Sequence, residues 1–149
     1  MTKKTLFLFA IFLNCGLLIA QNTFIRKPSI SPDASQMAFS FQGDIWVHNF
    51  SNNQSKRLTI HQGYESDPVW NAKGNQLAFT SNRRGSVNIF TTNVSGGIPK
   101  QLTYFPTTDT PSQWNSNGSI LFTTNRVYKG PEWDPEIYSI NEGGETPKR

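Results

Sequence analysis

Three segments of this chain repeat one order of residue types, and this repeat constrains the fold more than any other feature. The segments start at Pro28, Pro68 and Pro111, so successive starts are 40 and 43 residues apart. Each passes from its proline through a polar turn to an apolar run, which ends in a phenylalanine 11 residues after the proline. A period of this length indicates that the chain uses one supersecondary unit three times.

Each unit contains four short runs of aromatic and β-branched residues, separated by Asn, Gly, Asp, Ser and Pro, which is typical of an antiparallel meander. Runs such as Met37-Ala38-Phe39 and Ile45-Trp46-Val47 are apolar on both sides, so we expect both faces of each sheet to be covered. No stretch sustains the apolar spacing of an amphipathic helix. The sequence therefore predicts an all-β partial β-propeller of three four-stranded antiparallel blades.

The predicted organisation follows the repeat. We expect a signal peptide over residues 1–20, a lead segment over 21–27, and blades over 28–66, 67–109 and 110–149. The first two units end in Leu-Thr, at 58–59 and 102–103, whereas the third stops at Arg149, one position earlier. We therefore expect the chain to be a piece of a longer protein, cut within the last strand of its third blade.

The first residues have the layout of a secretory signal. Lys3 and Lys4 precede an almost wholly apolar segment that ends at Ala20, and this segment is shorter than the ~20 residues that a membrane helix needs. The only cysteine, Cys15, lies inside it, so the mature chain would contain no disulfide. These features predict an exported protein, periplasmic or secreted, with no membrane span in the mature chain.

The charge distribution gives no sign of a nucleic-acid partner. The net charge is +4, but removing Lys3 and Lys4 from the 14 basic residues leaves 12 against 10 acidic residues. The mature chain has no basic run longer than Arg83-Arg84. We therefore expect neither nucleic acid nor an anionic membrane surface as a partner.

Motifs of catalytic chemistry are absent from the sequence. It has no nucleophile elbow, zinc-binding His-Glu-x-x-His pair, phosphate-binding glycine loop or dinucleotide fingerprint. The only histidines, His48 and His61, have no partners at the spacing of a metal site or catalytic dyad, and Asp44 precedes its strand as a turn residue. We expect this chain to hold no catalytic residue, metal or cofactor.

Loop lengths point to one end of the predicted propeller. Loops between second and third strands share an end with the connections between blades, and they lengthen from 6 to 10 to 15 positions, measured from the phenylalanine to the next isoleucine. Such variation often serves binding. A mixture of charged and aromatic residues there suits a peptide or another extended polar ligand, although a plain solvated loop is the alternative. The candidate binding residues are Tyr64, Glu65, Arg83, Arg84, Asp109, Arg126 and Trp133.

The repeats resemble those of TolB and of the N-terminal half of tricorn-like proteases. Ser31-Pro32-Asp33 keeps most of the family turn, with Ala34 where the family has glycine, and Arg83 and Arg126 match the family's loop arginine. The stretches 41–46 and 80–85 look most like exported tricorn-protease homologues. TolB carries a separate domain before its propeller, whereas only about seven residues follow Ala20 before the first repeat here.

This resemblance implies a non-catalytic propeller segment that binds or gates peptide substrates for a serine peptidase domain beyond Arg149. Two alternatives stay open. One is a TolB-like periplasmic propeller that binds other proteins, and the other is a propeller fused to a different hydrolase. The coding sequence after Arg149 would separate the three.

Overall fold

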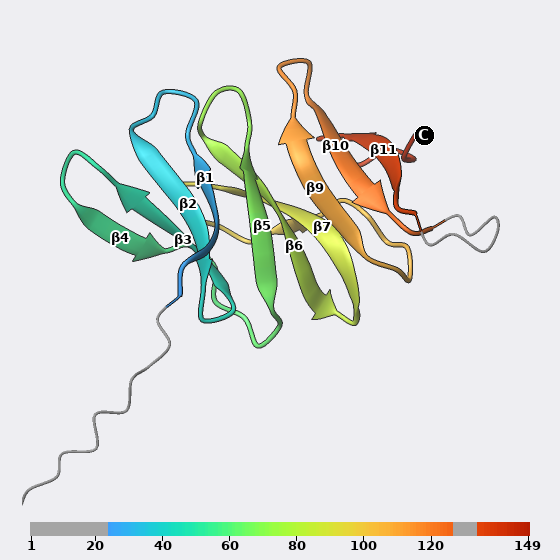
Figure 1. The fold of residues 1–149 in the computed structure, drawn as a ribbon, viewed down its shortest axis with the longest axis horizontal. Coiled ribbons are helices and arrows are strands. Elements are labelled where there is room, and N and C mark those ends of the chain that lie inside the picture. Colours follow the sequence, from blue (N-terminus) through green and yellow to red (C-terminus); the bar gives the residue numbers. More distant parts are fainter. Residues whose placement is uncertain (1–23, 127–133) are drawn as a thin grey trace, which may run out of the picture.

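The computed structural model describes residues 24–126 and 134–149, and it arranges them as three antiparallel sheets that stand side by side (Figure 1). The first sheet contains β1 (Arg26–Ile30), β2 (Gln36–Phe41), β3 (Asp44–Asn49) and β4 (Gln54–Arg57). The second contains β5 (Glu65–Trp70), β6 (Gln76–Arg84), β7 (Ser86–Asn93) and β8 (Lys100–Gln101). The third contains β9 (Asp109–Trp114), β10 (Ser119–Thr124) and β11 (Glu136–Asn141).

The third sheet also carries the start of a fourth strand. Lys148 forms an isolated antiparallel bridge with Ser139 of β11. Lys56 and Lys100 occupy the same place in the first two sheets, because they pair with β3 and β7 at the equivalent register position. The prediction of a partial β-propeller built from three four-stranded blades is confirmed, and we call the sheets blades 1, 2 and 3.

The cores lie between the blades. The first strands of the blades contact one another in turn, β1 with β5 and β5 with β9. Trp70 and Trp114 fill the spaces between successive blades, with 5% and 6% of their surfaces exposed. The indole nitrogen of Trp70 donates a 2.9 Å hydrogen bond to the carbonyl oxygen of Ser29, which links blade 2 to blade 1. Large aromatic side chains of this kind supply much of the energy of a packed interface.

Burial at one repeated position shows that each blade depends on the next. Ile45 of β3 and Ile89 of β7 are fully buried, and each packs into a cluster that includes residues of the following blade. Ile137 holds the same place in β11, and 64% of its surface is exposed. Each blade therefore presents an equivalent apolar face to the blade that follows it. In blade 3 this face is exposed among the described residues.

The turn between the first two strands of each blade contains one residue with a left-handed backbone. Gly74 and Gly118 fill this position in blades 2 and 3, with φ of 68° and 83°. Ala34 fills it in blade 1, with φ of 56°. Hydrogen bonds from Ser31 and then Ser35 lower the pKa of Asp33 in this turn to about 2. The turn of blade 1 thus keeps the left-handed backbone of the other two turns with alanine in place of glycine.

Ala34→Gly is expected to raise the free energy of unfolding in urea by about 0.5 to 1 kcal/mol, because the left-handed conformation penalises a Cβ atom more than glycine's added flexibility costs. Gly74→Ala is the matched reverse change and should lose about 1 kcal/mol. A Cβ atom there would meet Pro32 Cδ at an ordinary 3.6 Å, so backbone conformation alone is tested. A loss of stability in Ala34→Gly would contradict this account.

Candidate functional site

The predicted binding end is assembled from three parts of the chain. The connection from blade 1 to blade 2 passes the β2–β3 turn, where the Glu65 amide donates to the Gly43 carbonyl at 2.9 Å. It then passes the β6–β7 turn, where the Tyr64 amide donates to Asn82 Oδ1 at 2.7 Å. The prediction that these loops share one end with the inter-blade connection is confirmed.

Glycine is required where this connection crosses blade 2. A Cβ atom on Gly63 would lie 2.9 Å from Arg83 Cα and 3.0 Å from Arg83 N. Real Cβ atoms do not approach backbone so closely, so any side chain at this position would push the connection away from the β6–β7 turn. The close crossing fixes Tyr64 and Glu65, which follow directly, against blade 2.

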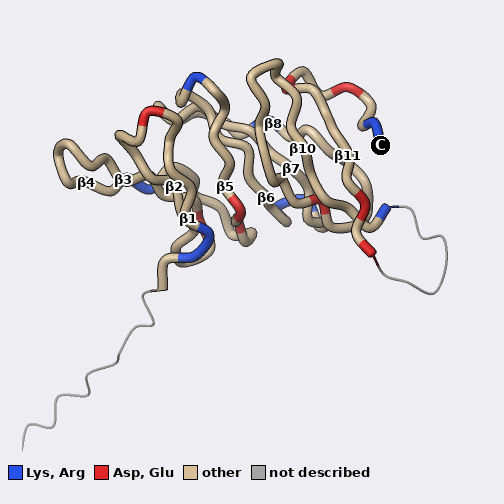
Figure 2. Tube along the Cα trace, turned by 45° about the horizontal axis from the view of Figure 1, so that its top comes forward, with Lys and Arg blue, Asp and Glu red and all other residues tan. Residues whose placement is uncertain are grey.

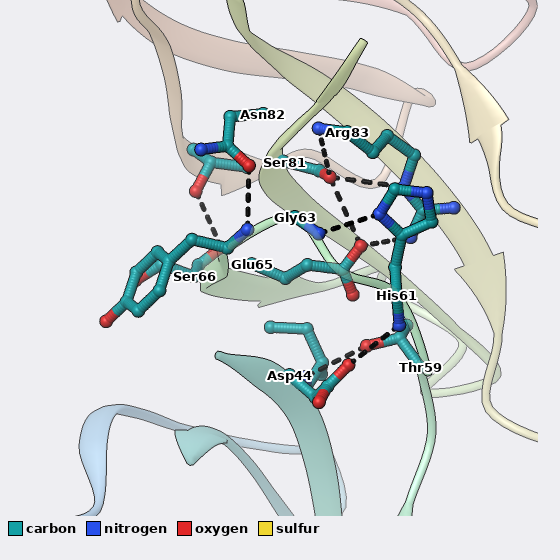
Figure 3. A network of polar contacts seen from close by, with 12 residues as sticks. Asp44, Thr59, His61, Gly63, Glu65, Ser66, Ser81, Asn82 and Arg83 are labelled. Atoms are coloured by element: carbon teal, nitrogen blue, oxygen red, sulfur yellow. Dashed lines mark hydrogen bonds and ion pairs between the residues drawn. The ribbon is translucent and has the colours of Figure 1, made fainter. Parts of the chain in front are cut away.

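Glu65 and Arg83 form a buried ion pair in blade 2 (Figure 3). Glu65 has no exposed surface, and Ser81 donates its hydroxyl to Glu65 Oε1 at 3.2 Å. The guanidinium carbon of Arg83 lies 5.0 Å from the ring centroid of Phe90, a distance at which a cation and an aromatic face attract. The Arg83 side chain is therefore held inside the end of blade 2 by Glu65 and Phe90.

Blade 3 repeats this arrangement with a shorter acid. Arg126 Nη2 lies 2.7 Å from Asp109 Oδ2, and Asp109 has no exposed surface. The Arg126 guanidinium carbon lies 5.1 Å from the Phe122 ring centroid and 5.2 Å from that of Tyr138. Two blades thus use the same acid, arginine and aromatic arrangement at the same end.

This placement corrects part of the predicted surface. The sequence placed Glu65, Arg83, Asp109 and Arg126 on exposed loops, but the acids are buried and only 12% and 11% of the arginine side chains is exposed. A repeated signal could have indicated the pairs. Each arginine stands four residues after the repeat's phenylalanine, and each acid stands two or three residues before its proline.

The other candidates divide between exposed and undescribed residues. Tyr64 has 49% of its surface exposed, and Arg84 is exposed at the end of β6. Trp133 lies outside the described residues. Binding by any of the seven candidates stays a prediction, and Tyr64 and Arg84 are the ones whose side chains are available at the surface.

A second polar network ties each fourth strand to the third. Asp44, which the sequence predicted to be a turn residue before its strand, is instead the first residue of β3 and is buried. It lies 2.5 Å from Arg57 Nη2 and accepts a 3.2 Å hydrogen bond from the His61 backbone amide (Figure 3). The hydroxyl of Thr59 accepts from the Ile45 amide at 2.9 Å, and the hydroxyl of Thr103 accepts from the Ile89 amide at 3.0 Å. The Leu-Thr residues of the repeat therefore fasten the end of each of these two blades.

The histidine contacts in the described ranges are structural. The ring Nδ1 of His61 accepts a 2.8 Å hydrogen bond from the Gly63 amide, which leaves its proton on Nε2. The His48 ring nitrogen lies 3.0 Å from the Ser55 hydroxyl. No hydrogen bond joins either ring to a carboxylate within residues 24–126 and 134–149. These contacts form no general acid–base pair.

Neither a cluster of metal-ligating side chains nor a membrane-spanning helix occurs in the described part of the chain. Across these residues, no group of three or more His, Cys, Asp or Glu side chains could hold a metal ion. The same residues include no helix of the length and apolar character that crossing a membrane requires.

Two of the known proteins that are similar in sequence to this chain carry protease or peptidase names. A protein of Sulfurisphaera tokodaii that carries the name of a tricorn-like protease N-terminal subunit is 29% identical over 136 residues, which cover 81% of this chain and 68% of that protein. The uncharacterised peptidase YuxL of Bacillus subtilis is 24% identical over 121 residues, covering 74% of this chain but only 18% of its own length.

Solved structures share the fold at lower identity. The tricorn protease superposes with a TM-score of 0.69 at 17% identity, over 82% of this chain and 13% of that one. TolB from Acinetobacter baumannii gives 0.65 at 23% identity, over 85% and 32%. The chain thus spans less than half of YuxL and of both solved chains.

Comparison with protein families gives a match over most of the chain. The model of the tricorn protease N-terminal beta propeller domain matches residues 22–149, which include every described strand. This chain therefore belongs to the tricorn protease N-terminal beta-propeller family.

Proposed function

We propose that this chain is the non-catalytic propeller segment of an exported tricorn-like serine protease, and that it binds peptide substrates at the end that carries the inter-blade connections. The observation that supports this most is the family match over residues 22–149, combined with the exposed Tyr64 and Arg84 at that end. Aromatic and arginine side chains contribute most to binding at protein surfaces.

Blade architecture suits this role. The buried ion pairs of Glu65 with Arg83 and of Asp109 with Arg126 brace the loop bases, so the exposed side chains stand on rigid supports. A ligand then binds without a large cost of ordering the loops. In this proposal, peptide cleavage is carried out by a separate domain of the parent protein.

A second role, a TolB-like propeller that binds folded proteins, is supported by a local match to a TolB protein of Alcanivorax borkumensis. That match is 29% identical over 73 residues and covers 46% of this chain. Selective binding of folded envelope proteins, with no binding of unfolded peptides, would favour this role.

Export is part of the proposal and rests on residues 1–20, which lie outside the described ranges. Secretion of the full chain from a bacterial host, with removal of the segment up to Ala20, is the expected result. N-terminal sequencing of the exported protein checks it, and an unprocessed chain that stays in the cytoplasm would overturn export.

Peptide binding is tested by the fluorescence anisotropy of short labelled peptides of mixed polar and aromatic sequence. Tyr64→Ala and Arg84→Gln are each expected to weaken binding by about 10-fold, because each removes a candidate contact residue. Lys73→Gln is the matched control, since it removes a positive charge from the β5–β6 turn at the opposite end of the blade. Equal affinity in all variants, or a loss only in Lys73→Gln, would contradict the proposed surface.

A further inference from the structure

Blades 1 and 3 stand at the two ends of the row of blades (Figure 1). Every blade has two faces, because side chains alternate between them along each strand. We call the face that packs on the preceding blade the leading face, and the face that packs on the following blade the trailing face. Two clusters of buried residues join trailing to leading faces, one between blades 1 and 2 and one between blades 2 and 3. The leading face of blade 1 and the trailing face of blade 3 are therefore left open among the described residues.

One repeat position marks the leading face. Trp70 and Trp114 hold it in blades 2 and 3, where only 5% and 6% of their surfaces are exposed. Ile30 holds it in blade 1, because it pairs with β2 as the two tryptophans pair with β6 and β10. Ile30 is 51% exposed. An apolar side chain thus stands in solvent at a position that packing between blades buries.

The trailing face of blade 3 is open in the same way. Ile137 is 64% exposed, although Ile45 and Ile89 are fully buried at its position in the other blades. Leu121 is half-buried, whereas the alanines at its position in blades 1 and 2 have no exposed surface. The two open faces are therefore the apolar halves of one interface, which the molecule forms twice within itself.

A lysine makes the same polar contact across both internal interfaces. Lys56 Nζ of blade 1 donates to the Ser95 carbonyl oxygen at 3.2 Å, and Lys100 Nζ of blade 2 donates to the Gly143 carbonyl oxygen at 2.9 Å. Each acceptor stands two residues after the third strand of its blade, a place that Ser51 holds in blade 1. Lys148 holds the donor position in blade 3, where Figure 2 shows the basic C-terminal end of the chain on the outer side of the blade. The open faces thus carry the donor and the acceptor of a third contact of this kind.

We propose that two copies of this chain bind head to tail, with the trailing face of blade 3 of each copy on the leading face of blade 1 of the other. Ile137 and Ile30 then enter one apolar cluster, as Ile45 and Trp70 do inside the molecule. Lys148 of one copy donates to the Ser51 carbonyl oxygen of the other.

Blade number sets the size of this assembly. A head-to-tail contact gives a closed ring only when the copies complete a full rotation, and otherwise gives a filament. Propellers close with about 4 to 8 blades. Two copies of three blades make six, whereas three copies make nine. The assembly therefore stops at a pair, and this inference does not depend on peptide binding.

Sedimentation velocity of the full chain tests the pair. We expect single copies in dilute solution, with both faces exposed, and a species of twice that mass as the concentration rises. All variants keep residues 1–23, so differences between them report on the blades. A single copy at every concentration would overturn the inference and leave the faces to blades outside this chain. Growth into assemblies larger than a pair would overturn the closed ring.

Two variants on opposite faces identify the contact. Ile30→Asp and Ile137→Asp should each raise the dissociation constant of the pair by about 100-fold or more, because both interfaces of the ring would then bury a charge. Mixing the two variants should restore part of the pairing, since a mixed pair contains one unchanged interface. Ile98→Asp is the matched control and should leave pairing unchanged, because Ile98 is 98% exposed in the β7–β8 connection.

These variants also exclude another arrangement. Weakening by Ile137→Asp but not by Ile30→Asp would indicate that two trailing faces meet, and it would overturn head-to-tail binding, as would a mixture that does not pair. Both positions are more than half exposed in the single chain, so dilute variants should stay folded, which circular dichroism checks.

The lysine contact has its own test. Lys148→Met should weaken the pair severalfold, because it removes the donor and keeps an apolar stem. Arg149→Met is the neighbouring control and should not weaken it, since Arg149 pairs with Glu136 inside its own blade. Equal affinity of Lys148→Met and the unchanged chain would overturn the proposed lysine contact.

Discussion

Arg126→Met is expected to lower the free energy of unfolding by about 3 to 5 kcal/mol, the largest loss that we expect from any charged residue here. The change leaves the carboxylate of Asp109 fully buried without its counterion. It also removes a cation that lies within 5.2 Å of the Phe105, Phe122 and Tyr138 ring centroids. Urea unfolding followed by tryptophan fluorescence measures the loss.

Two further variants show whether the buried charge causes this loss. Arg149→Met breaks the pair with Glu136, in which 62% of the arginine side chain is exposed, and should cost about 1 kcal/mol or less. Combining Arg126→Met with Asp109→Leu should recover most of the stability, because an apolar pair then replaces an unpaired charge. If the double variant is no more stable than Arg126→Met alone, packing by the arginine stem explains the loss instead.

Ile89→Ala and Ile137→Ala form a matched pair at one repeat position, and we expect very different results from them. Ile89 is fully buried against blade 3, so its truncation should cost about 2 to 5 kcal/mol. Ile137 has 64% of its surface exposed, so its truncation should change stability by about 0.5 kcal/mol or less. Urea titrations of both variants measure the contrast.

The exposed member of the pair also reports self-association. Equal losses in the two variants would mean that a second molecule covers Ile137 in solution, since only burial makes a deleted methyl group costly. Repeating the titration at several protein concentrations separates the cases, because stability that depends on association rises with concentration. A concentration-independent melt with a large loss in Ile137→Ala would contradict the described packing.

The blades were predictable because their signals are local and repeated. The proline, the apolar run and the phenylalanine recur at fixed spacing, and β-strand periodicity then assigns the sheets without information on distant contacts. The loop end was also predictable, since an antiparallel chain reverses at every turn. Ala34 is a further example, because it has a left-handed backbone at the position where the repeat places glycine.

Burial at the loop end was not predictable from residue type alone. Charged residues that follow a strand are usually solvated, and nothing in the local sequence shows that the Phe90 ring lies beside the Arg83 guanidinium. The start of β1 at Arg26 was not predictable either, because the residues before Pro28 lie outside the repeat and no local pattern pairs Arg26 with Ser40.

The buried ion pairs have a consequence for how binding surfaces of this kind diversify. Glu65 and Arg83 both belong to blade 2, and Asp109 and Arg126 both belong to blade 3. Each pair is therefore contained within one blade, so the loss of one pair leaves the pair of the neighbouring blade intact. Ile25 and Gly43 stand at the corresponding positions of blade 1, which lacks such a pair. The residues at the loop end of one blade can thus change without unsettling the polar core of the next blade.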